Sequence, residues 1–133
     1  MPQRIRIISA EVPEPPAERW SNCLRVGDTV FVSGMTARTG DGQGVIGADA
    51  YTQSKAIFAK IKHLVVAAGG EIDDVAKLTI YVTDIKDNVG VWKARAEFFS
   101  GHFPTSTLVQ VAALASPVLL VEIDAIAMVE PAQ

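Results

Sequence analysis

The chain has 133 residues, of which 49% are hydrophobic and 20% charged, and its formal net charge is −3. This length suits a single domain over residues 1–133 that folds around its own apolar core without needing a disulfide or a metal ion. The acidic balance and the lack of a cluster of Lys and Arg argue against nucleic-acid binding, and no apolar run is long enough to predict a membrane-spanning helix.

The first part of the chain predicts short strands joined by loops. Residues 5–8 suggest a strand and lead into Glu11 and the prolines of residues 13–16, a pattern unlike a signal peptide. Residues 21–33 predict a hairpin around a Gly-Asp turn, with Cys23 as a small apolar strand residue. One cysteine cannot form an internal disulfide, which agrees with a cytoplasmic location.

Residues 34–49 are rich in glycine and match no phosphate-binding motif, so this segment is predicted to be a loop.

The second part of the chain alternates helices with strands. Apolar residues at helical spacing predict a helix over 51–68, ended by Gly69 and Gly70, and a second helix over 89–99 that begins after Asp87 or Asn88. Strands are predicted over 75–82, 107–114 and 118–129. This order favours an α+β fold with two helices packed on one face of a mixed sheet. The other face is also expected to carry apolar residues and therefore to be buried against further copies of the chain.

The last predicted strand carries two carboxylates, Glu122 and Asp124, within a long apolar run. A spacing of two places both on one face of the strand. A carboxylate on an apolar face is costly unless it is paired or faces a cleft. Two interpretations follow from the pattern: an acid or base with a tuned pKa, or a solvent-facing position near the end of the strand.

The other candidate residues, histidine and tryptophan, occur as isolated side chains and form no recognisable catalytic or metal-binding motif. His63 is expected on a solvated helix face, and His102 lies in a connection where functional residues are common but turn or capping roles are commoner. No spacing of His and Cys predicts a metal site. Trp92 occupies an apolar position of the second helix, where core or interface packing is expected, and Trp20 follows the proline-rich arm, where it could cover a pocket.

Several segments together resemble the Rid (YjgF-like) family over residues 20–129. They are the Val-Ser-Gly that ends the hairpin, the Ala-Ala-Gly-Gly after the first helix, KLTIYVTD, and FPTSTLVQVAALASPVLLVEIDAIA. The resemblance implies a chorismate-mutase-like fold, a homotrimer with a β-barrel core and clefts between subunits. It also implies hydrolysis of reactive enamines and imines by an activated water, with no cofactor.

The resemblance also assigns roles to individual residues. Glu122 would position the water or the imine nitrogen, and the backbone of Gly34, preceded by Ser33, would line the cleft. Trp20 stands where the family often has a pocket tyrosine, and Trp92 where many members have an asparagine. The arginine that binds the substrate carboxylate is replaced by Ser106.

The replacement at Ser106 leaves two hypotheses open. Ser106 and Thr107 offer hydroxyl groups but no fixed charge, so the first hypothesis is a deaminase with an altered, larger or aromatic substrate. The second is a trimer that binds a small metabolite without turning it over. Ribonuclease activity is disfavoured by the acidic balance of the chain.

Overall fold

A computed structural model describes residues 2–131 of the chain. Its elements are the strands β1 (Arg4–Arg6), β2 (Cys23–Val26) and β3 (Thr29–Met35), the helix α1 (Ala50–Ala67), the short 3-10 helix η1 (Ile72–Asp74), the strand β4 (Val75–Val82), the 3-10 helix η2 (Ile85–Asp87), the helix α2 (Asn88–Phe98), and the strands β5 (Thr105–Gln110) and β6 (Val121–Met128). Neither of the two α-helices in this part of the chain is long and apolar enough to cross a membrane.

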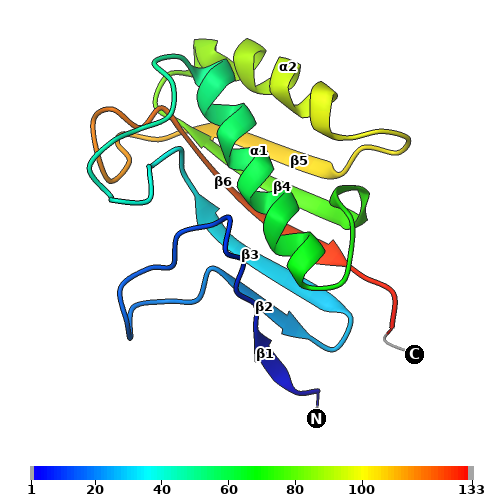
Figure 1. Cartoon of the computed structure of the whole chain (residues 1–133). Helices are drawn as coiled ribbons and strands as arrows, with labels where there is room; N and C mark the ends of the chain where they lie inside the picture. Colours follow the sequence, from blue (N-terminus) through cyan, green and yellow to red (C-terminus); the bar gives the residue numbers. More distant parts are fainter. Residues whose placement is uncertain (1, 132–133) are drawn as a thin grey trace.

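The strands form one sheet in the order β1-β2-β3-β6-β4-β5, and both α-helices cover the same face of it (Figure 1). All neighbouring strands are antiparallel except β4 and β5, which are parallel. A parallel pair needs a crossover, and α2 provides it. The predicted α+β fold, with two helices on one face of a mixed sheet, is confirmed.

Local interactions define both ends of α1, and the sequence predicted the glycines at its C-terminal end. The side chain of Asp49 caps the first turn by accepting a hydrogen bond from the backbone N–H of Thr52 at 2.8 Å. The helix ends before Gly69, whose φ of +100° favours glycine, and the N–H of Gly70 donates to the carbonyl of Val65 at 3.0 Å.

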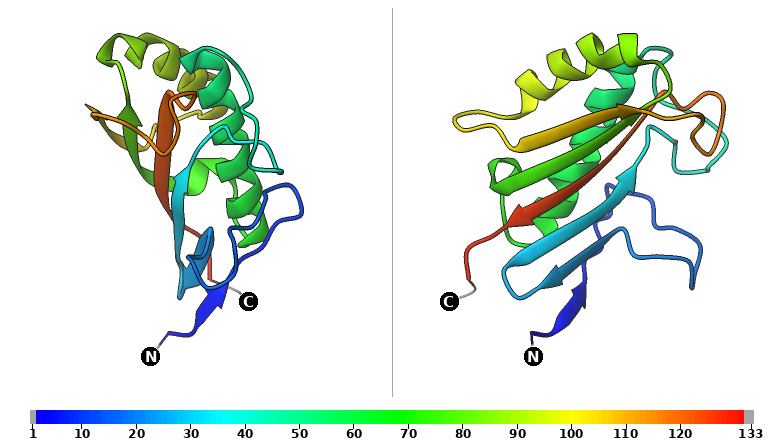
Figure 2. Two further views of the ribbon diagram at one scale, coloured as in Figure 1. Left: turned by 90° about the vertical axis from the view of Figure 1, so that its left-hand side faces the viewer. Right: turned by 180° about the vertical axis from the view of Figure 1, so that it is seen from behind.

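The hydrophobic core lies between the helices and the sheet. Along β6, Val121, Ile123, Ala125 and Ala127 are buried under the helices. The intervening residues point to the opposite side, which no element covers when the molecule is seen from behind (Figure 2). We call this side the open face; its side chains include Phe31, Ser33, Thr79, Tyr81, Thr107, Val109, Glu122, Asp124, Ile126 and Met128.

The last two strands differ from the predicted ranges. The fifth strand begins at Thr105 rather than 107 and ends at Gln110 rather than 114. It pairs with β4 as far as Val82, and beyond that point β4 turns into η2, so the following residues have no strand to pair with. The sixth strand starts at Val121 rather than 118, because Gln53 of α1 holds the preceding segment through the carbonyl of Val118 and the N–H of Leu120.

Candidate active site

A β-bulge in β3 shapes the centre of the open face. Val32 pairs with Ala125 and Met35 with Ile123, so β3 contains one residue more than β6 over this stretch. As a result Ser33 and Gly34 both lie towards the open face while Met35 returns to the core. The bulge brings two residues that the sequence singled out, Ser33 and Gly34, next to β6.

Glu122 packs directly against Gly34. A Cβ atom added at Gly34 would lie 2.5 Å from Oε2 of Glu122 and 2.8 Å from its Cδ, closer than any side chain tolerates. Within residues 2–131 the carboxylate of Glu122 has no hydrogen-bond partner. Burial raises the pKa of Glu122, and the nearby charge of Asp124 raises it further. A half-buried carboxyl group that readily keeps its proton suits general acid and base chemistry.

Two more polar side chains adjoin Glu122. Tyr81 of β4 lies opposite Glu122 in the ladder, and its hydroxyl donates to Oδ2 of Asp124 at 3.3 Å. The negative charge of Asp124 is the main cause that raises the pKa of Tyr81, with smaller contributions from burial, from this hydrogen bond and from Glu122. The phenol is therefore a hydrogen-bond donor at neutral pH. The prediction that Glu122 and Asp124 share one face of the strand is confirmed.

The register of β5 separates Ser106 from Thr107. Thr107 pairs with Thr79, which in turn pairs with Asp124, so Thr107 lies on the open face two strands from Asp124, about 10 Å away. Ser106 pairs with Leu78 and faces the helices, where its Oγ accepts a hydrogen bond from Nη1 of Arg95 at 2.8 Å. Within one chain, Ser106 and Glu122 therefore lie on opposite faces of the sheet.

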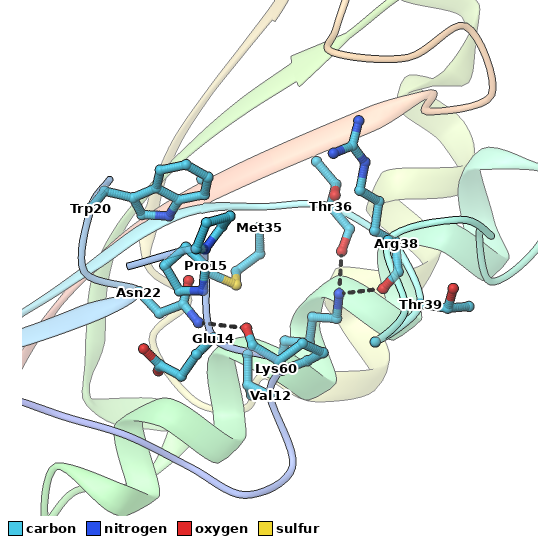
Figure 3. A pocket seen from close by; sticks show the side chains of 15 residues that line it. Val12, Glu14, Pro15, Trp20, Asn22, Met35, Thr36, Arg38, Thr39 and Lys60 are labelled. Atoms are coloured by element: carbon cyan, nitrogen blue, oxygen red, sulfur yellow. Dashed lines mark hydrogen bonds between the residues drawn. The ribbon is translucent and has the colours of Figure 1, made fainter. Parts of the chain in front are cut away.

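Trp20 lines a hollow of about 190 Å³ between the proline-rich arm, Gly34 and the residues after β3 (Figure 3). At its base, Nζ of Lys60 donates to the carbonyls of Thr36 and Arg38 at 2.7 and 2.8 Å, and burial lowers the pKa of Lys60. Trp20 itself is 55% exposed. The structure thus places Trp20 and Gly34 on one hollow, and their role in substrate binding stays a prediction.

Asn22 connects this hollow to the bulge. Its buried side chain donates to the carbonyl of Pro13 at 2.8 Å, while its backbone carbonyl accepts from both the N–H and the hydroxyl of Ser33 at 2.9 and 3.2 Å. The hydroxyl of Ser33 is therefore occupied by the backbone carbonyl of Asn22, just before β2. Its backbone position, rather than its free hydroxyl, defines the site.

The remaining sequence candidates lie elsewhere. Trp92 is 51% exposed on α2, so core packing is excluded for it within the chain and interface packing stays a prediction. His63 and His102 are both exposed. Cys23 is fully buried in β2. Among residues 2–131, no three His, Cys, Asp or Glu side chains gather closely enough to hold a metal ion.

Sequence reasoning missed two residues, Tyr81 and Arg95. The alternation of buried and exposed residues along β4 could have placed Tyr81 on the face away from the helices. That Tyr81 lies beside Glu122 depends on the pairing of β4 with β6, which the sequence does not show. Arg95 is one of the 12 basic residues, and nothing in its helix distinguishes it. The structure shows its contact with Ser106, which no pattern in the sequence indicates.

The protein is a small α+β domain with a mixed sheet and helices on one face of it. On the other face, a carboxyl group held against a glycine forms a polar site. The chain matches the model of the family described as "Endoribonuclease L-PSP" over residues 11–129. It belongs to this family, also known as the Rid or YjgF family.

Similar proteins cover nearly the same length. One is the "Putative reactive intermediate deaminase TdcF" of Escherichia coli, 37% identical over 109 residues, which covers 77% of this chain and 81% of the relative. Another is the "2-iminobutanoate/2-iminopropanoate deaminase" of Dermatophagoides farinae, 30% identical over 94% of this chain and 97% of the relative. The crystal structure of PA3499, a protein of unknown function from Pseudomonas aeruginosa, has 40% identity and a TM-score of 0.87 over 98% of this chain and 96% of its own.

Proposed function

We propose that this protein hydrolyses the enamine or imine forms of small metabolites, with Glu122 as the acid and base. The observation that carries the proposal is the environment of Glu122: a half-buried carboxyl group against Gly34, without a hydrogen-bond partner among residues 2–131 and with a raised pKa. Relatives named as deaminases of reactive intermediates and of 2-imino acids support the same reaction class.

In this reaction, protonated Glu122 donates a proton to the imine nitrogen while water adds to the carbon of the C=N bond. One proton of the water passes to the Glu122 carboxylate and its OH group stays on the carbon, which gives a carbinolamine. Glu122 then protonates the amine, which departs as ammonia, and the hydroxyl group gives its proton back to Glu122 as the carbonyl forms. One imine and one water thus become one carbonyl compound and one ammonia. An enamine first takes a proton on carbon to become the imine.

Tyr81 and Asp124 support Glu122 in this scheme. The negative charge of Asp124 helps Glu122 to keep the proton that it must donate. The hydroxyl of Tyr81 holds Asp124 in place from the neighbouring strand. Neither residue is required to exchange protons with the substrate.

We also infer that the open face is covered in a homotrimer. Phe31, Val109 and Met128 are 44%, 41% and 53% exposed in the single chain, an unusual arrangement for large apolar groups on one face of a sheet. Sedimentation equilibrium is expected to give a particle of three 14.2 kDa chains. Phe31→Glu should reduce its mass to that of one chain. A monomeric wild-type protein would contradict this inference.

The alternative is a trimer that binds a metabolite without turning it over. The observation that favours it is the placement of Ser106 on the face opposite to Glu122, because a single chain then does not bring the two expected substrate contacts together. Binding of a ligand without any product would support this alternative.

Glu122→Gln tests the proposed function. The amide keeps the shape of the side chain but cannot carry the proton, so the rate of imine hydrolysis should fall by about 10²- to 10⁴-fold. A 2-imino acid generated by an amino acid oxidase serves as substrate, and ammonia release is followed. Glu130→Gln, an exposed carboxylate near the C-terminus, is the matched control and should retain the wild-type rate. Equal rates for wild type and Glu122→Gln would reject the mechanism.

A further inference from the structure

Lys60 holds a half-buried ammonium group at the base of the hollow beside the proline-rich arm (Figure 3). Its Nζ donates to the carbonyls of Thr36 and Arg38 at 2.7 and 2.8 Å. An ammonium group has three N–H donors, so one of them has no acceptor among residues 2–131. The ion pairs in this part of the chain involve other cations, so no carboxylate neutralises Lys60.

The missing counter-charge is unfavourable because Lys60 is partly removed from water. Burial lowers the pKa of its ammonium group. Glu14 also lines the hollow, but its carboxylate is paired with Arg6 at 2.5 Å. The two carbonyl groups compensate only in part, since a carbonyl oxygen carries a partial negative charge. An anion that enters the hollow would complete the environment of the ammonium group.

The rest of the hollow indicates which kind of anion fits. Its volume of about 190 Å³ lies below the range of about 300–1,000 Å³ that is usual for drug-sized ligands, so the ligand must be small. Much of its lining is apolar and consists of the side chains of Val12, Pro13, Pro15, Pro16, Trp20 and Met35. A small anion with an apolar body therefore suits the hollow better than a fully polar one.

The number of hydrogen-bond donors favours a carboxylate over a phosphate. The base of the hollow offers the remaining N–H of Lys60 and the hydroxyl of Thr36, which has no hydrogen-bond partner among residues 2–131. The hydroxyl of Thr39 is already bonded to Asp41 at 2.6 Å. Two donors match the two oxygens of a carboxylate, whereas a phosphate group has more oxygens and more charge to satisfy.

The hollow is separate from the site around Glu122. Glu122 does not line the hollow, and Gly34 borders both places. Lys60 belongs to α1, which covers the face of the sheet opposite to the open face (Figure 1). A ligand at Lys60 therefore has a place of its own and need not be the molecule on which Glu122 acts.

We propose that the base of this hollow binds a small apolar carboxylate, whose charge contacts Lys60 and whose hydrocarbon part lies against Met35 and the proline-rich arm. The ligand class is an acid with one ring or a short carbon chain. Binding does not require hydrolysis by Glu122, so the inference goes beyond the proposed function.

An NMR titration of ¹⁵N-labelled protein with benzoate tests the site. Benzyl alcohol has the same ring without the charge and should bind at least about 10-fold more weakly. Benzoate should shift the amide signals of Thr36 and Thr39 and the indole N–H signal of Trp20. Inorganic phosphate should bind more weakly than benzoate. Equal binding of benzoate and benzyl alcohol, tighter binding of phosphate, or no binding of benzoate would overturn the inference.

Two variants locate the site. Lys60→Met removes the charge and should weaken benzoate binding by about 10-fold or more, whereas Lys62→Met removes an exposed charge from the same helix and should bind as the wild type does. Because Lys60→Met also loses two hydrogen bonds, Gly40→Leu provides a second variant that keeps Lys60. A Cβ at Gly40 meets only Pro13, at an ordinary 3.5 Å, so leucine can fill the hollow and should also weaken binding.

Thermal unfolding identifies which variants are folded. Wild-type affinity for benzoate in folded Lys60→Met, or in folded Gly40→Leu, would contradict the proposed site. Glu122→Gln should bind benzoate as the wild type does even where it loses imine hydrolysis, which separates a failure of this site from a failure of the proposed function. Loss of benzoate binding by folded Glu122→Gln would place the probe in the candidate active site and would also overturn the inference.

Discussion

The contact between Gly34 and Glu122 allows a quantitative test of the active-site geometry. In the variant Gly34→Ala the new Cβ would lie 2.5 Å from Oε2 of Glu122, whereas ordinary contacts begin at about 3.4 Å. The carboxyl group must therefore move by about 1 Å. A displacement of this size in a reacting group lowers a rate by about 10²-fold. We expect Gly34→Ala to lose about this factor in kcat for imine hydrolysis.

The same variant should leave the fold intact. Gly34 does not have a positive φ, so alanine is compatible with its backbone conformation. The Glu122 side chain lies at the open face and has rotamers available to move away from the new methyl group. The melting temperature should therefore change little, which distinguishes a displaced catalytic group from an unfolded protein. Urea unfolding of the same sample provides a second measure.

A double-mutant cycle completes the test. In a Glu122→Ala background the clashing carboxyl group is absent, so Gly34→Ala should have no further effect on the residual rate. A kcat for Gly34→Ala within twofold of the wild type would refute the reasoning. So would an equal loss from Gly34→Ala with and without Glu122, because the effect would then not act through the carboxyl group.

Three further predictions concern other parts of the molecule. Asp124→Asn removes a like charge, so the pKa of Glu122 should fall and the alkaline limb of the pH–rate profile should move to lower pH; an unmoved limb would contradict this. Gln53→Ala removes three buried hydrogen bonds between α1 and two loops, so urea unfolding should show a loss of about 2–4 kcal/mol, and a loss below about 1 kcal/mol would count against it. Burial raises the pKa of Cys23 to about 12, so a thiol reagent at pH 8 should label only unfolded protein, and rapid labelling of folded protein would disprove this.

Much of the fold could be predicted because local patterns agree with tertiary packing. The apolar spacing and the glycine stop predict α1, and the alternation predicts β6. In both elements the apolar residues are the ones that pack into the core. The start of β6 and the end of β5 were less accurately predicted. Both depend on contacts distant in sequence: Gln53 with the segment before β6, and the end of β4 beside β5.

The candidate site was predictable only where residue type and strand period were sufficient. Glu122 and Asp124 were placed on one face correctly because a strand repeats every two residues. The same rule puts Ser106 and Thr107 on opposite faces, but which of them faces Glu122 depends on the parallel register with β4. Arg95 could not be connected with Ser106 at all, because the crossover geometry of α2 determines that contact.

The central claim is that Glu122 catalyses the hydrolysis of imines, and a single side-by-side time course tests it most directly. 2-Iminobutanoate is generated in situ, and ammonia is measured with buffer, with the wild-type protein and with Glu122→Gln. The account predicts a clear acceleration by the wild type and a loss of about 10²- to 10⁴-fold in that acceleration for the folded variant. Ammonia release by the wild type at the rate in buffer, or an undiminished rate with Glu122→Gln, would contradict it.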